Sequence, residues 1–186
     1  MRILFPFIVF SLAVSACMIV TRPTDQELLA LDNPPPAVLE KLERLFPRVL
    51  SWYEQVEAEL LPKGRPLSPR ETDFAIRIGV KEPDRVRIVV LDDFPLPSDP
   101  ELRKEVERIG MGSKNEGGRT NGHVIMLKTW AAEDDSIISH ELVHVAQQDR
   151  LGREPFIRRY MVEMEMMGYA RSPLELEAYA KQSSSL

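Results

Sequence analysis

Two of the three histidines in this chain, His140 and His144, stand four residues apart in a segment of helical periodicity. Side chains at this spacing lie one turn apart on the same face of an α-helix. The opposite face of the segment is apolar and carries three residues at helical spacing: Ile138, Leu142 and Val145. We therefore predict an amphipathic helix over residues 134–150 that packs its apolar side on a core.

The composition is that of one globular domain. The chain has 186 residues, of which 44% are hydrophobic and 28% are charged. These figures suffice for a hydrophobic core and exclude a disordered chain and a coiled coil. The formal net charge of −5 argues against a nucleic-acid partner, which needs a basic face. With a single cysteine, the chain cannot form an intramolecular disulfide or a thiolate zinc cluster.

The first 16 residues have the features of a signal peptide, because Arg2 precedes an apolar stretch over residues 3–14. The sequence Val14–Ser15–Ala16–Cys17 resembles the lipobox of bacterial lipoproteins, in which the cysteine becomes the acylated first residue. Two alternatives are cleavage by an ordinary signal peptidase, which leaves Cys17 as a thiol, and an uncleaved anchor. In each case the rest of the chain is exported. The lipobox predicts lipid anchoring in the cell envelope, on the periplasmic or cell-surface side.

These features predict three segments along the chain. A signal peptide covers residues 1–16, a tether covers 17–36, and a single domain covers 37–186. The prolines at 34–36 are not expected to be helical and suit a short stiff spacer.

The periodicity of the chain predicts a mostly helical α+β fold. Helices are expected over six ranges: 37–61, 69–78, 100–109, 134–150, 155–167 and 173–181. Strands are expected over two ranges, 85–91 and 123–128. Pro47 is expected to kink or break the first helix. We expect a small mixed or antiparallel sheet packed against the helix that carries the two histidines.

A glycine-rich segment precedes the second strand. Five of the nine glycines fall within residues 110–122. The segment leads into a strand and lacks a Gly-Lys-Ser/Thr sequence, so it is not a phosphate-binding loop. We expect either a mobile hairpin or a flap over a site.

Glu141 completes a His-Glu-x-x-His motif with the two histidines. On one helix these residues can supply two zinc ligands and a general base for a zinc-bound water. A catalytic zinc site usually takes a third protein ligand. Cys17 and His123 are weaker candidates than the glutamates of the segment Ser172–Tyr179. There, Glu175 and Glu177 lie about 200° apart around one helix, so only one of them can face the site. Glu175 also fits a capping box with Ser172, which is a competing structural role for its side chain.

The pair of segments His140-Glu141-x-x-His144 and Glu175-x-x-Ala178 resembles the gluzincin branch of the zincin metallopeptidases. In that family the third ligand is the glutamate of a Glu-x-x-Ala/Ser-Asp sequence, which falls here on Glu175. Tyr179 stands where the family usually has an aspartate that orients a ligand histidine. The flanking sequence Val145-Ala-Gln147-Gln148 is similar to that of small bacterial members. The resemblance covers about residues 123–180.

The resemblance implies one Zn²⁺ per chain, held by His140, His144 and Glu175, with Glu141 as the general base. It also implies that the strand before the active-site helix, 123–128, forms the sheet edge on which an extended substrate pairs. The glycine-rich segment would then be its rim or flap. A donor to the reacting carbonyl oxygen would come from a tyrosine or a histidine: Tyr169, Tyr160 or His123.

We therefore expect an exported, lipid-anchored zinc metallopeptidase that acts on a peptide or protein substrate. One alternative is a non-enzymatic zinc-containing lipoprotein that binds an envelope partner along its sheet edge. A second alternative is a zinc hydrolase that acts on a non-peptide amide, such as a cell-wall crosslink. The presence of Glu141 favours an enzyme, because a purely structural zinc site needs no base.

Overall fold

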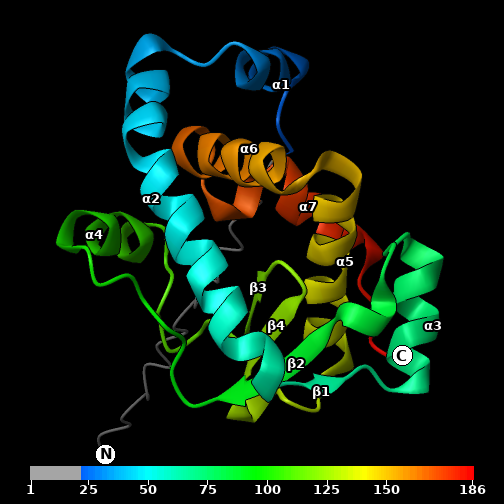
Figure 1. Ribbon diagram of the computed structural model, residues 1–186. Helices are drawn as coiled ribbons and strands as arrows, with labels where there is room; N and C mark the ends of the chain where they lie inside the picture. The colour runs from blue at the N-terminus through cyan, green and yellow to red at the C-terminus, as the bar shows by residue number, and fades with distance from the viewer. Residues whose placement is uncertain (1–21) are drawn as a thin grey trace, which may run out of the picture.

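The computed structural model describes residues 22–186 (Figure 1). The predicted signal peptide, the lipobox and Cys17 lie outside the described residues. Among the residues that are described, every helix is too short or too polar to cross a membrane.

The described part of the chain is an α+β fold, as expected. Its α-helices are α1 (Asp25–Asp32), α2 (Pro36–Leu60), α3 (Pro69–Ile78), α4 (Pro100–Arg108), α5 (Asp135–Leu151), α6 (Arg153–Met166) and α7 (Pro173–Lys181). Its strands are β1 (Arg65–Pro66), β2 (Arg87–Leu91), β3 (Gly118–Asn121) and β4 (Val124–Lys128). The six predicted helices and two predicted strands all form, and each predicted end lies within two residues of the observed one.

The four strands form one mixed sheet in the order β1-β2-β4-β3. β2 and β4 are parallel, while β1 and β3 pair antiparallel to their neighbours. The prediction that residues 123–128 form the sheet edge is wrong, because β4 is paired on both sides and all five of its residues are buried. The two edge strands are β1 and β3, and the one beside β4 is β3, which comes from the end of the glycine-rich segment.

Helices cover both faces of this sheet (Figure 1). On one face, Ile88 and Leu127 pack against α3 and against Leu142 and Val145 of α5. On the other face, Val89 and Met126 pack against α2. The apolar side of α5 is therefore buried against the sheet as predicted, and its histidine-bearing side faces away from the strands.

A third apolar cluster joins α1, α2, α6 and α7 beyond the end of the sheet. α1 takes part through Leu31, and its first turn is closed by a capping box between Thr24 and Glu27. Residues 25–36 are therefore not the tether that the sequence suggested. Pro36 is the first residue of α2, a position where the fixed φ of proline suits a helix.

Pro47 lies inside α2, yet α2 is a single helix of 25 residues. The expected break is absent because α2 buries apolar side chains on both sides of the proline, among them Leu42, Phe46 and Tyr53. Burying each such side chain stabilises the fold by roughly 1.5–3 kcal/mol, which together exceeds the cost of about 3 kcal/mol for an internal proline.

Candidate metal centre

Helices α5 and α7 bring His140, His144 and Glu175 together in a buried cluster. One ligand atom from each residue lies within 4.8 Å of the other two. The Nε2 atom of His140 is 3.2 Å from Glu175 Oε2, and that of His144 is 3.5 Å from Glu175 Oε1. The three residues are 6%, 7% and 1% exposed, respectively. Two imidazole nitrogens and a carboxylate that converge in this way can hold a metal ion.

The side chain of Glu175 reaches the cluster because another glutamate supports the start of α7. Ser172 caps α7 through its oxygen, which accepts a hydrogen bond from the Glu175 N–H at 3.3 Å. Glu163 of α6 accepts hydrogen bonds from the Ser172 hydroxyl at 2.6 Å and from the Leu174 N–H at 3.0 Å. Glu163 thereby supplies the acidic partner at this helix start, and the carboxylate of Glu175 points to the histidines.

Glu177 points away from the cluster, as its position on the helix predicts. Its carboxylate accepts hydrogen bonds from Arg150 and Lys181, each at 2.7 Å, and from the amide of Gln147 at 3.1 Å. The structure thus separates the two candidate ligands: Glu175 belongs to the buried cluster, and Glu177 belongs to a partly exposed ion-pair network.

Each histidine of the cluster is oriented by a glutamine. The Nδ1 atom of His144 lies 2.9 Å from Gln147 Oε1, and the Nδ1 atom of His140 lies 3.0 Å from Gln182 Oε1. An amide oxygen only accepts, so each Nδ1 is the donor, and each Nε2 is the ring nitrogen that faces the cluster and can bind a metal ion once it has lost its proton. The orientation of Gln147 is fixed further because its amide NH₂ donates to the carbonyl oxygen of Leu174 at 2.9 Å.

Glu141 lies beside the cluster and against the edge strand. The Thr120 hydroxyl of β3 donates a hydrogen bond to Glu141 Oε2 at 2.7 Å. The backbone of Gly118 comes so close that a Cβ atom there would lie 2.6 Å from Glu141 Oε1. Burial raises the pKa of Glu141, and the charges of His144 and His140 and the Thr120 hydrogen bond offset only part of that rise.

The electrostatics of the cluster favour a cation. Burial alone would lower the pKa of His144, but the hydrogen bond and the charge of Glu175 outweigh it and raise this pKa to about 9. Burial would raise the pKa of Glu175, but its hydrogen bonds with His140 and His144 hold the pKa well below the usual range. The buried carboxylate therefore attracts positive charge to the space between the two rings.

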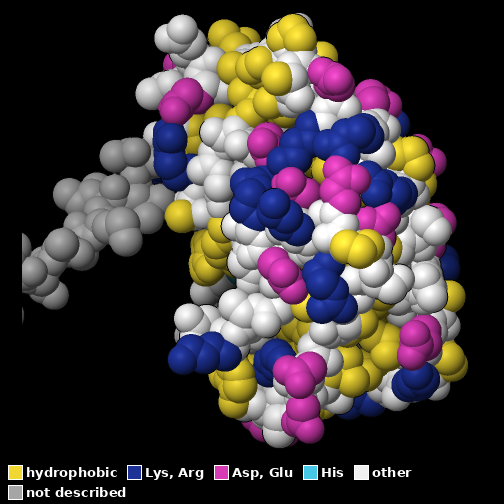
Figure 2. All heavy atoms as spheres, turned by 90° about the vertical axis from the view of Figure 1, so that its left-hand side faces the viewer, with side chains coloured by type: hydrophobic (Ala, Val, Ile, Leu, Met, Phe, Trp, Pro, Cys, Tyr) yellow, Lys and Arg dark blue, Asp and Glu magenta, His cyan; other side chains and the backbone are white. Residues whose placement is uncertain are grey.

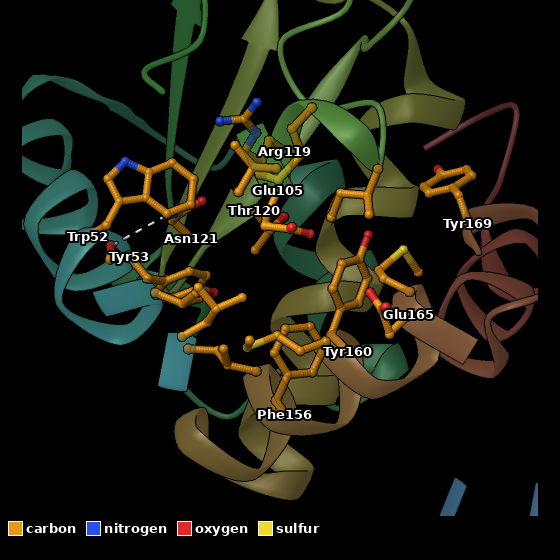
Figure 3. A pocket seen from close by; sticks show the side chains of 18 of the residues that line it. Trp52, Tyr53, Glu105, Arg119, Thr120, Asn121, Phe156, Tyr160, Glu165 and Tyr169 are labelled. Atoms are coloured by element: carbon orange, nitrogen blue, oxygen red, sulfur yellow. Dashed lines mark hydrogen bonds between the residues drawn. The ribbon is translucent and has the colours of Figure 1, made fainter. Parts of the chain in front are cut away.

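Two cavities meet at the cluster, and both are lined by His140, Glu141, Tyr160 and Tyr169. The first, of about 200 Å³, extends between α2, α4 and α6 and is mostly apolar. Figure 3 shows Trp52 and Tyr53 on one side of it and Phe156 and Tyr160 on the other. The second, of about 590 Å³, lies along the glycine-rich segment. Its walls include three exposed aromatic side chains: Trp130, Tyr169 and Tyr179.

Ion pairs close the outer side of the first cavity. Lys41 of α2 pairs with Glu105 of α4 at 2.7 Å and with Glu165 of α6 at 2.9 Å. Arg48 of α2 pairs with Asp99 at the start of α4 at 2.8 Å. Figure 2 shows acidic and basic side chains interspersed over this face of the molecule. Lys41, Glu105 and Glu165 therefore form a charged rim on this side of the apolar space.

The candidate donors to a reacting carbonyl oxygen lie in different places. Tyr169 lines both cavities, and its hydroxyl is 3.2 Å from that of Tyr179. Tyr160 donates a hydrogen bond to Glu175 Oε1 at 2.8 Å. His123 lies in the turn between β3 and β4 beside Glu57 and lines neither of these two cavities.

Four residues that support the cluster were not assigned a role from the sequence: Thr120, Gln147, Glu163 and Gln182. Gln147 had a local signal, because it stands three residues after His144 and so shares its helix face. Gln182 stands seven residues after Glu175, which also gives the same face. Thr120 and Glu163 reach the site from other elements and had no such signal.

Comparison with known protein families, with curated proteins and with solved structures found no match to this chain.

Proposed function

We propose that this protein is a zinc-dependent metallopeptidase. The observation that carries the proposal is the buried cluster of His140, His144 and Glu175, with Glu141 beside it at the meeting point of two cavities. A structural metal site would have no use for a further buried carboxylate beside the ligands in the wall of two cavities. The non-enzymatic alternative is therefore less well supported.

The donor set suits zinc in particular. Two imidazole nitrogens and one carboxylate oxygen are a common catalytic zinc set, which leaves a coordination position for water or substrate. The hydrogen bonds from both Nδ1 atoms leave both Nε2 atoms free to act as ligands. A zinc ion held there would polarise a carbonyl oxygen and lower the pKa of a bound water.

Glu141 would then act as the proton carrier of the reaction. Its pKa is raised by burial, which makes it a better base than an exposed glutamate and a competent acid once protonated. In the proposed mechanism it accepts a proton from the attacking water and passes that proton to the leaving nitrogen. Thr120 holds the carboxylate toward β3 through Oε2.

Tyr169 is the proposed donor to the carbonyl oxygen. Its ring is exposed, but desolvation of its hydroxyl and the nearby charge of Glu175 raise the pKa of that hydroxyl, so it keeps its proton at neutral pH and can donate it. Tyr160 has a similarly raised pKa, first through burial, but its hydroxyl is engaged with Glu175 and positions that carboxylate.

The edge strand β3 and the first cavity indicate which kind of substrate the site would bind. The outer edge of β3 is unpaired within the described sheet, so an extended peptide can add to it through main-chain hydrogen bonds. The apolar cavity beside His144 and Glu141 would take a large apolar side chain next to the scissile bond. A non-peptide amide in an extended substrate would meet the same residues.

The test uses the chain from Thr24 onward, loaded with zinc, and its Glu141→Gln variant. Both are incubated with a diverse peptide mixture, and the cuts are read by mass spectrometry. We expect cuts by the wild type only, with large apolar residues enriched beside the cut. Equal cutting by both proteins would contradict the role of Glu141. No cutting by a protein shown to hold zinc would favour a non-peptide amide or a binding role.

We also propose that the protein is exported and lipid-anchored, on the basis of residues 1–17 alone. Expression of the full chain in a bacterial host with a radiolabelled fatty acid should label the wild type and not a Cys17→Ser variant. Label in both proteins, or in neither, would contradict acylation at Cys17.

A further inference from the structure

Gln182 occupies the C-cap position of α7, seven residues after Glu175. Seven residues are close to two helical turns, so Gln182 and Glu175 project from the same side of α7 toward α5. The side-chain oxygen of Gln182 lies 3.0 Å from Nδ1 of His140, while Glu175 Oε2 lies 3.2 Å from Nε2 of the same ring. One helix therefore contacts both nitrogens of His140.

Tyr179 stands between these two residues and contacts the ring in another way. Its own ring packs edge-on against His140, with 4.7 Å between the ring centroids. The hydroxyl of Tyr179 pairs with that of Tyr169 at 3.2 Å, and the partner of Nδ1 is Gln182. Ala178, which is fully buried, lets α7 approach α5 closely enough for this contact.

The segment after Gln182 is fastened to α5 directly beside His140. The Ser139 hydroxyl donates to the carbonyl oxygen of Ser183 at 3.0 Å and accepts from the Ser183 N–H at 2.8 Å. The Leu186 N–H donates to Asp135 at 3.1 Å, and its side chain packs on the apolar cluster below α5. These contacts hold the backbone on the C-terminal side of Gln182 in place.

We propose that Gln182 is a positioning residue of the metal centre, and that residues 183–186 are the clamp that holds it against His140. The inference rests on the proposed function in that it assumes a metal ion at this cluster. Gln182 fixes which nitrogen of His140 carries the proton and holds the ring so that Nε2 faces Glu175 and His144. A partner of this kind, lying behind a ligand, commonly changes metal affinity by about 10- to 100-fold.

Both acceptors behind the histidines are amides, and this affects the charge of the metal centre. Gln147 and Gln182 both offer uncharged oxygens, so neither adds negative charge behind the ligands. An amide also does not titrate, so neither acceptor changes its charge with pH. A carboxylate at position 182 would keep the acceptor and add a charge that makes His140 a stronger ligand.

The experiment measures the zinc dissociation constant of the full chain by competition with a chromophoric chelator. Gln182→Met keeps the side-chain length but removes the strong acceptor, and it should weaken zinc binding by about 10- to 100-fold. Gln182→Glu should bind zinc at least as tightly as the wild type. Ser139→Ala, which removes both contacts to Ser183, should weaken binding in the same direction. Ser51→Ala, at an exposed position on α2 and outside both cavities, is the control and should leave binding unchanged.

A second measurement does not depend on zinc or on the variants. Histidine tautomers are read by NMR from the ring nitrogen shifts of the metal-free wild type. We expect Nδ1 of His140 to carry a proton, because it faces the Gln182 oxygen. A bare Nδ1, or equal zinc affinity for Gln182→Met and the wild type, would overturn the inference while the proposed function stands. A wild type that binds no zinc would overturn both.

Discussion

The Thr120 hydroxyl on the edge strand and the Glu141 carboxylate on the metal-site helix are joined by a hydrogen bond of 2.7 Å. The strand proposed to hold the substrate therefore also holds the proposed base. The same hydroxyl lies 3.1 Å from the backbone carbonyl oxygen of Glu141, so the contact fixes β3 to α5 at this turn of the helix.

Thr120→Val should move the pH dependence of the reaction. The Thr120 hydrogen bond lowers the pKa of Glu141, and valine removes it without a change in shape. A base must be deprotonated to work, so a higher pKa shifts the rising acidic limb of kcat/KM to higher pH. The profile of the variant should therefore lie at higher pH than that of the wild type. An unmoved limb would show that Glu141 does not set it.

Glu163→Gln should reduce both stability and zinc affinity. Glu163 is buried and accepts hydrogen bonds from Ser172, Leu174 and Arg159. Loss of the charged acceptor should lower the free energy of unfolding by about 1–3 kcal/mol in urea titrations. With this partner weakened, Glu175 can turn to the start of α7, and zinc binding should weaken. Unchanged zinc affinity in a destabilised variant would mean that Glu163 only caps the helix.

Val49→Phe should change substrate preference rather than the chemistry. Val49 lies on α2 and lines the first cavity away from the metal cluster. A larger side chain there should lower kcat/KM for peptides with a large apolar residue at the cut by about 10- to 200-fold. Peptides with alanine at the same position serve as the control and should be cut as before. Equal losses for both peptides would show that the cavity does not receive the side chain.

The ionisation of Glu57 should make the free energy of unfolding depend on pH in the acid range. Burial would raise its pKa, but hydrogen bonds from His123 and the charge of Arg153 outweigh burial and lower it. A lowered folded-state pKa stabilises the fold above the unfolded value of 4.5, and this contribution is lost as pH falls through the folded value. Glu57→Gln should therefore lose stability at pH 7 and little at pH 3, as measured by urea unfolding. A constant difference across this range would contradict the assignment.

The helical part of the site could be predicted because helix geometry is local. Spacing alone placed His140, Glu141 and His144 on one turn and set Glu175 apart from Glu177. The edge strand could not be found in this way, because Gly118–Asn121 has no alternation of apolar residues and contributes through backbone pairing. The uniformly apolar β4 has instead the pattern of a central strand.

The sequence contains a signal for helix α1 within the segment that was predicted to be a tether. Thr24 and Glu27 have the spacing of a capping box, and the helix that they open buries Leu31. The consecutive prolines suggested an extended spacer, but a proline is also favourable as the first residue of a helix. Glu163 and Gln182 depend on the packing of α6 and α7, which no local pattern specifies.

The proposed metal centre requires that His140, His144 and Glu175 together hold one zinc ion, and Glu177 on the same helix offers the comparison. Zinc content and the zinc dissociation constant would be measured for the wild type, Glu175→Ala and Glu177→Ala. We expect one zinc per wild-type chain, binding weakened by more than about 100-fold in Glu175→Ala, and a change below about 10-fold in Glu177→Ala, because Glu177 reaches the cluster only through Gln147. Equal effects of the two substitutions, or a larger effect at Glu177, would contradict it.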